Sequence, residues 1–149
     1  MLDFFKNALL STCENNKSGS DSEKIKLATC ALFLEIANSD DEIAEVELKT
    51  IYSIMKDTFD LTDEEVNHLI KLSEEQIQKS VSLFEFTQTI NEHFSMDEKY
   101  EIVKNLWRII LADNKLDPYE EHLIKIISGN FQFYHKDLIA AKLEVKGEN

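Results

Sequence analysis

Apolar side chains recur every three to four residues along most of the chain, which is the spacing of amphipathic α-helices. Two stretches differ because they are apolar on nearly every side, and they are residues 27–37 and 102–112. A helix of this kind needs neighbours all around it. We therefore expect these two helices, with Phe33 and Trp107, at the centre of an all-α fold, a single-domain bundle of seven to eight helices.

Helix starts are marked by a Ser, Thr or Asp followed three residues later by Glu, the capping-box pattern. The pairs are Ser20–Glu23, Thr62–Glu65, Ser82–Glu85, Ser95–Glu98 and Asp117–Glu120. Pro118 stands at a first helical position, and Gly129 is expected to end the same helix. The predicted helices span residues 2–12, 21–38, 44–58, 62–74, 82–93, 96–112, 118–128 and 134–146.

The first predicted helix is short and amphipathic. It places Leu2, Phe5 and Leu9 on one face, with Phe4 and Ala8 on the neighbouring face. Docking on the body of the protein, on a partner or on a membrane would each cover these side chains. We expect docking on the body, because the polar side has little positive charge. Polar residues 14–22 then predict a flexible connector.

Charge and composition narrow the classes of partner. The 149 residues carry a formal net charge of -13, which repels phosphate backbones and anionic lipids. We therefore expect no nucleic-acid partner, and metal cations or basic proteins fit better. The chain has no transmembrane-length apolar run and no basic signal-peptide start, which predicts a cytoplasmic protein. Cys13 and Cys30 form no CxxC pair, and Cys30 is expected in the core.

An internal repeat appears when the chain is shifted by 73 residues. Each copy contains an apolar helix, an Asp at its end, an apolar plug three residues further on (Ile43 or Leu116), and a Glu seven residues after the Asp. This predicts two helix-turn-helix halves related by a pseudo-two-fold axis. One domain, residues 1–149, would then comprise an N-terminal helix and linker (1–21), a first repeat (22–58) and a second repeat (95–130). The acidic residues of the two turns are Asp40 and Glu47 in the first copy, and Asp113, Asp117 and Glu120 in the second.

At these turns the sequence resembles the TerB-like family, which includes a tellurite-resistance protein and the N-terminal domain of the co-chaperone DjlA. Residues 112–114 with Asp117 and Glu120 match the family's repeated pattern well. The first copy matches less fully, because Ala44 stands where Asp117 stands in the second, and both copies lack the glycine after the Asp. The resemblance covers about residues 22–142. It implies an all-helical fold and, for some members, divalent-cation binding at the acidic turns, with no known catalytic activity.

The acidic turns allow two interpretations. Carboxylate oxygens suit Ca²⁺, Mg²⁺ or Mn²⁺ rather than Zn²⁺, so the candidate metal ligands are the five acidic residues of the two copies. Alternatively, Asp117 and Glu120 are the cap and first-turn acid that many helix starts carry. Capping explains Asp40 and Asp113 less well, because they follow the C-terminal ends of apolar helices, where the dipole disfavours anions. Neither turn is an EF-hand, since the sixth-position glycine and twelfth-position glutamate are missing.

A catalytic arrangement is not evident. The four histidines form no HExxH motif, and Glu65 with His68 is a single ExxH, where a di-iron carboxylate bundle needs two. The acidic patch of residues 40–47 could also dock a basic partner. We therefore predict a TerB-like interaction module that is divalent-cation dependent, in a stress response of the tellurite-resistance type or in envelope-associated complexes. The alternative is a small metal-binding carrier or a metal-dependent enzyme of unknown substrate. We expect a protein partner, and a homodimer is the second kind of assembly considered.

Overall fold

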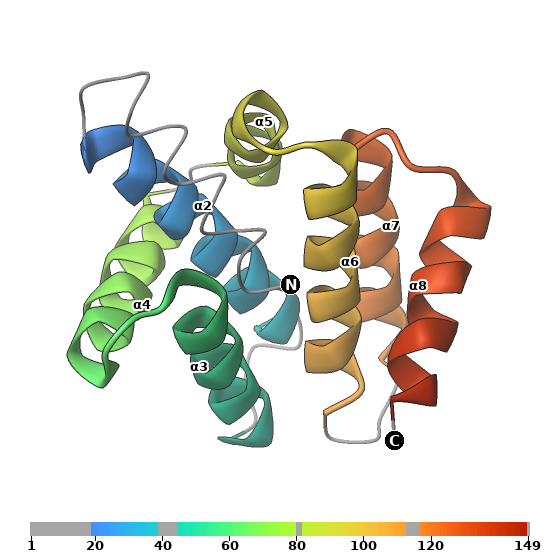
Figure 1. Ribbon diagram of the computed structural model, residues 1–149, viewed down its shortest axis with the longest axis horizontal. Helices are drawn as coiled ribbons and strands as arrows, with labels where there is room; N and C mark the ends of the chain where they lie inside the picture. Colours follow the sequence, from blue (N-terminus) through green and yellow to red (C-terminus); the bar gives the residue numbers. More distant parts are fainter. Residues whose placement is uncertain (1–18, 39–44, 80–81, 113–116, 149) are drawn as a thin grey trace.

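The computed structural model describes residues 19–38, 45–79, 82–112 and 117–148. The described residues form seven α-helices and no strand, which confirms the predicted all-α class (Figure 1). The predicted helix at 2–12 and the plugs Ile43 and Leu116 lie outside the described residues. The helices are α2 (Gly19–Ala37), α3 (Glu45–Phe59), α4 (Asp63–Gln78), α5 (Leu83–His93), α6 (Met96–Ile110), α7 (Pro118–Asn130) and α8 (His135–Gly147).

The two central helices predicted from the sequence are α2 and α6. They pack against each other, α2 also contacts α3, α4, α5 and α7, and α6 also contacts α3, α7 and α8. Phe33 and Leu106 are fully buried, Trp107 almost so, and Cys30 lies in the core as predicted. Both helices are thus covered by neighbours on several sides, which is why their sequences are apolar nearly all round.

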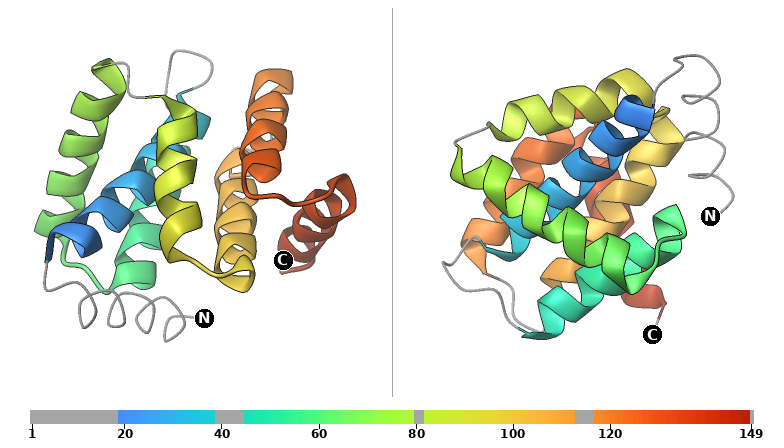
Figure 2. Two further views of the ribbon diagram at one scale, coloured as in Figure 1. Left: turned by 90° about the horizontal axis from the view of Figure 1, so that it is seen from above. Right: turned by 90° about the vertical axis from the view of Figure 1, so that its left-hand side faces the viewer.

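The repeat extends further than the sequence comparison found, because a third helix belongs to each half. The packing of α2, α3 and α4 on one another is matched by the packing of α6, α7 and α8, and the contact of α2 with α7 is matched by that of α6 with α3. Exchanging the two halves therefore leaves these contacts unchanged. Only α5 lies outside this scheme among the described helices; it sits beside α2 and α7 (Figure 2).

A one-residue difference between the halves hides the third helix from a shift of 73. Asp60 after α3 and Gln132 after α7 both adopt positive φ, 56° and 70°, and they are 72 residues apart. At both places the next residue, Leu61 or Phe133, donates its N–H to a carbonyl five residues back. These are Schellman ends followed by a hydrophobic residue that packs on the core. From here on the two halves match at a shift of 72.

Most of the predicted helix starts are confirmed. Thr62 and Ser95 form complete capping boxes, and the Ser82 side chain accepts the N–H of Glu85. The start predicted at Ser20 is wrong, because α2 already includes Gly19. A cap signal requires only residues three apart, but the preceding residues can still join the helix.

The predicted stop at Gly129 is also wrong. Helix α7 continues through Gly129 to Asn130, and Gln132 takes the left-handed conformation. Tertiary packing explains the difference. With the helix ending at Asn130, Phe131 is fully buried and Phe133 packs on the core. Glycine lowers the cost of a left-handed residue, but it does not decide where the turn falls.

Candidate cation-binding turns

Two of the predicted site residues occupy equivalent places in the two halves. Glu47 is the third residue of α3 and Glu120 is the third residue of α7. Their exposed fractions are only 3% and 5%. Each carboxylate therefore lies in the first turn of a helix, where backbone N–H groups have no partner within the helix, at the positive end of the helix dipole. Two buried acids 73 residues apart are the strongest structural expression of the repeat at these turns.

Burial of Glu47 changes the picture of the acidic patch. Glu45 is exposed and lies 3.6 Å from Lys49, which is the arrangement of a solvated helix face. Glu47, two residues further, points into the protein and does not belong to a surface that a basic partner could contact. The docking-face interpretation therefore loses Glu47, and residues 40–42 of the patch lie outside the described residues.

Asp117 is placed by its role as a helix cap. It precedes α7, and its Oδ1 accepts the N–H of Tyr119 at 3.0 Å. The expected bond to the N–H of Glu120 is replaced by this bond to Tyr119. One carboxylate oxygen of Asp117 is thus used locally, as the capping interpretation predicts.

The other predicted ligands, Asp40 and Asp113, lie outside the described residues. Helix α2 ends at Ala37 and α6 ends at Ile110, slightly earlier than predicted. Both Asp residues thus come three positions along the sequence after the last residue of a helix. Within the four described ranges, no three His, Cys, Asp or Glu side chains gather as a metal site would require.

Glu65, the acid of the single ExxH motif, has a structural role at the start of α4. Glu65 accepts the backbone N–H of Thr62 at 2.9 Å and completes the capping box of α4. This backbone hydrogen bond is the main reason why the pKa of Glu65 is lowered. His68 is exposed on the same helix and, with Glu65, lines a hollow of about 300 Å³ between α2 and α4. One carboxylate oxygen of Glu65 is thus used by the helix start, and Glu65 lies exposed on α4, whereas the ligands of a di-iron bundle project into its interior.

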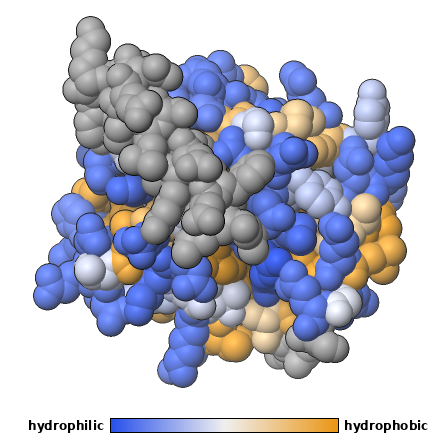
Figure 3. All heavy atoms as spheres, in the orientation of Figure 1, coloured by the Kyte–Doolittle hydropathy of each residue, from blue (hydrophilic) through white to orange (hydrophobic). Residues whose placement is uncertain are grey.

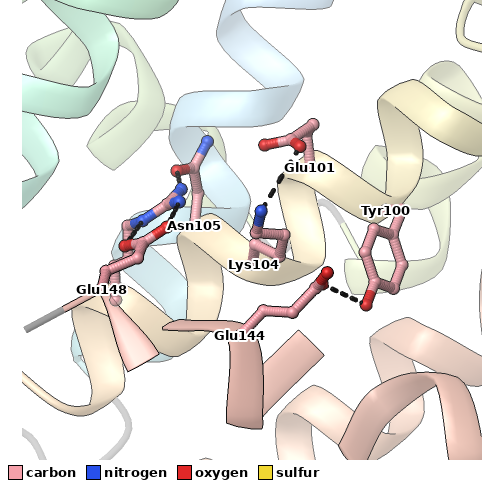
Figure 4. A network of polar contacts seen from close by, with 7 residues as sticks. Tyr100, Glu101, Lys104, Asn105, Glu144 and Glu148 are labelled. Atoms are coloured by element: carbon pink, nitrogen blue, oxygen red, sulfur yellow. Dashed lines mark hydrogen bonds and ion pairs between the residues drawn. The ribbon is translucent and has the colours of Figure 1, made fainter. Parts of the chain in front are cut away.

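A polar network joins α6 to α8 (Figure 4). The Tyr100 hydroxyl donates to Glu144 at 2.5 Å, and the Arg108 guanidinium makes two bonds to Glu148. The same guanidinium holds the pKa of Glu148 below its ordinary value. The sequence-based predictions do not include this network. Its signal is visible afterwards, because Tyr100, Lys104 and Arg108 are spaced four apart, as are Glu144 and Glu148.

A second polar cluster joins α5 to α7 and α6. Asn91 donates to the Asn130 carbonyl at 2.9 Å, and the Asn130 side-chain amide donates to the Thr87 hydroxyl at 3.2 Å. The largely buried Lys99 donates to the Asn91 side-chain oxygen at 2.9 Å, and burial lowers the pKa of Lys99. These bonds fix α5 against the start of α6 and the end of α7.

Surface hydropathy and helix length bear on contact with a membrane. The face shown in Figure 3 is mainly hydrophilic, with small separate hydrophobic areas. None of the described helices combines the length and the apolar character that crossing a bilayer requires.

The protein is thus an all-helical bundle of two equivalent halves, and each half has a buried Glu in the first turn of its second helix. The family described as tellurite resistance protein TerB matches residues 26–143. The chain therefore belongs to the TerB family, as the resemblance at the acidic turns implied. A crystal structure of a protein of unknown function, PG1108 from Porphyromonas gingivalis W83, is similar over 84% of this chain and 95% of that chain, with 18% identity and a TM-score of 0.62. This similarity shows a shared fold. A comparison with curated proteins gave no significant match.

Proposed function

We propose that the protein is an intracellular interaction module whose two acidic turns bind a divalent cation, Ca²⁺ or the similar hard cations Mg²⁺ and Mn²⁺. The module would act in a stress response of the tellurite-resistance type or in envelope-associated complexes. Membership of the TerB family supports the class of protein. The cation is supported by one observation, the equivalent burial of Glu47 and Glu120.

The physical reason lies in the cost of burying carboxylates. A buried charge requires compensation by hydrogen bonds, by dipoles or by an opposite charge. The start of α3 or α7 supplies part of it through the helix dipole. A hard cation bound between this Glu and the Asp of the preceding turn would add an opposite charge and tie two helices together. The second turn should bind more tightly, because Asp117 stands where the first turn has Ala44.

The test is calorimetric titration with Ca²⁺, Mg²⁺ and Mn²⁺, combined with the melting temperature at each concentration. Wild type is expected to bind, and its Tm should rise with cation concentration by mass action. Glu120→Gln with Asp113→Asn should remove the tighter site, and Glu47→Gln with Asp40→Asn the weaker one. Glu45→Gln and Glu121→Gln are matched controls near the same helix starts, and they should leave binding unchanged.

Two outcomes would overturn the proposal. Absence of heat and of a Tm rise at millimolar cation would reduce the buried acids to helix-start residues. Cation binding accompanied by measurable hydrolase or oxidoreductase turnover would instead favour a metal-dependent enzyme over an interaction module.

A further inference from the structure

Helix α5 fills a defined place between the two halves. It packs on α2 of the first half and on α7 of the second (Figure 2). Its apolar side consists of Leu83, Phe86 and Ile90, spaced at i, i+3 and i+7, of which Phe86 and Ile90 are buried. Asn130 at the end of α7 bonds to α5 through Thr87 and Asn91.

In the repeat, α6 is the counterpart of α2 and α3 is the counterpart of α7. The place equivalent to that of α5 therefore lies between α6 and α3. The structure has a groove of about 520 Å³ there, and its walls come only from α3 and α6 among the described residues. Val46, Thr50 and Ile54 of α3 line this groove. The exposed Lys49 and Asp57 and the partly buried Arg108 also line it. Helix α5 packs on both α2 and α7, but none of the seven described helices packs in the equivalent way on both α6 and α3 at this groove.

The order of elements along the chain identifies the occupant. Helix α5 immediately precedes α6, so its counterpart should precede α2, and the chain before α2 is residues 1–18. Leu2, Phe5 and Leu9 have the i, i+3, i+7 spacing of the apolar residues of α5, with an aromatic ring in the same middle position. We propose that residues 2–12 form a helix that occupies the α3–α6 groove, as α5 occupies the place between α2 and α7.

Charge supports this register. Aligning Leu2 with Leu83 aligns Lys6 with Thr87, the residue that bonds to Asn130. The counterpart of Asn130 in the first half is Asp57, an exposed acid at the groove. Lys6, the one basic residue of the segment, would therefore meet a carboxylate where α5 has a hydroxyl facing an amide. This is an ion pair at a partly exposed rim, so it sets register more than affinity.

The connection is long enough. Two residues, Phe94 and Ser95, join α5 to α6. Residues 13–18 supply six between the proposed helix and α2, which can span about 20 Å when extended. Helix α2 also begins four residues before the position equivalent to Met96, or about 6 Å along its axis. The longer connector therefore more than bridges the difference.

Paramagnetic labelling of the full chain tests the proposal directly. A spin label on Lys49→Cys, in a Cys13→Ser background that keeps the buried Cys30, places the probe on the groove rim. The amide signals of residues 3–10 should broaden within one molecule. Unbroadened signals would overturn the proposal. Broadening seen only when labelled and unlabelled molecules are mixed would also overturn it, because the groove would then hold a second copy.

Two adjacent phenylalanines provide a matched pair for specificity. Phe5 aligns with the buried Phe86, whereas Phe4 aligns with the exposed Glu85. Phe5→Asp should abolish the broadening and lower Tm by about 5 °C, and Phe4→Asp should do neither. Equal effects of the two changes would contradict the register. A second check uses Lys6→Cys with Asp57→Cys, which should form an intramolecular disulfide, while Phe4→Cys with Asp57→Cys should not.

Discussion

The indole Nε1–H of Trp107 donates a hydrogen bond of 3.1 Å to the carbonyl oxygen of Leu138, and this joins the central helix α6 to α8. Both residues are buried. The contact lies in the second half of the repeat, and it shows how a core residue predicted from the sequence acquires a specific partner 31 residues away.

Trp107→Phe should lower the free energy of unfolding by about 1–3 kcal/mol. The change removes the indole donor and leaves unfilled volume in the core. Urea unfolding followed by circular dichroism measures it, since Trp107 is the only tryptophan and its fluorescence would be lost. Tyr100→Phe is the control, because it removes a hydroxyl bonded to the exposed Glu144 and should cost less than about 1 kcal/mol. Equal losses would show that the indole bond has no special weight.

Truncation at the centre of the bundle should be costly in both halves. Phe33→Ala in α2 and Leu106→Ala in α6 should each lower stability by roughly 2–5 kcal/mol, because both side chains are fully buried. Phe84→Ala is the matched control, since Phe84 is 62% exposed and its truncation should change little. Thermal unfolding measures all three. An unchanged Tm for either central variant would contradict the central position of its helix.

Two substitutions at the C-terminal end of α7, one inside the helix and one just after it, should each stabilise the protein. Gln132 adopts a φ of 70°, which costs a non-glycine residue about 1 kcal/mol, so Gln132→Gly should recover part of that cost. Gly129 lies inside the helix, and a Cβ there would meet nothing within 4 Å. Gly129→Ala should therefore add about 0.5–1 kcal/mol. The reverse pattern, with both changes destabilising, would show that α7 ends at Gly129 in solution.

Alkaline pH should weaken the junction of α6 and α8. Burial, and then the hydrogen bond to Glu144, raise the pKa of Tyr100 to about 12. The folded state thus favours the neutral phenol, so its contribution to stability is complete below pH 10, the ordinary pKa, and is lost as the pH rises towards 12. The Tm of wild type should fall relative to Tyr100→Phe across this interval. Parallel Tm curves for the two proteins would contradict the raised pKa.

Local patterns account for the features that the sequence predicted well. The capping boxes at Thr62 and Ser95 depend on a hydroxyl and a carboxylate three residues apart, so they form once the backbone turns into a helix. The central position of α2 and α6 followed from apolar residues on every side. Both signals lie within one element, and the structure confirms both.

Features that depend on two elements were predicted less well. The third helix of each half escaped detection because one residue fewer between Glu120 and Gln132 than between Glu47 and Asp60 changes the shift from 73 to 72. The burial of Glu47 was not predicted either. Glu47 is itself charged and lies between Glu45 and Lys49 in the same turn, and only the packing of α3 on the rest of the bundle removes it from solvent.

The sequence by itself determined the helical class, the two central helices, most helix starts and the repeated Asp–Glu spacing, because each is expressed in residues a few positions apart. Tertiary structure decided that Glu47 and Glu120 are equivalent buried acids, that Gln132 rather than Gly129 forms the turn after α7, and that α3 and α6 line an open groove among the described residues. These features require side chains from helices far apart in the chain to meet. Their free energy depends on what each residue is packed against, which no local spacing encodes.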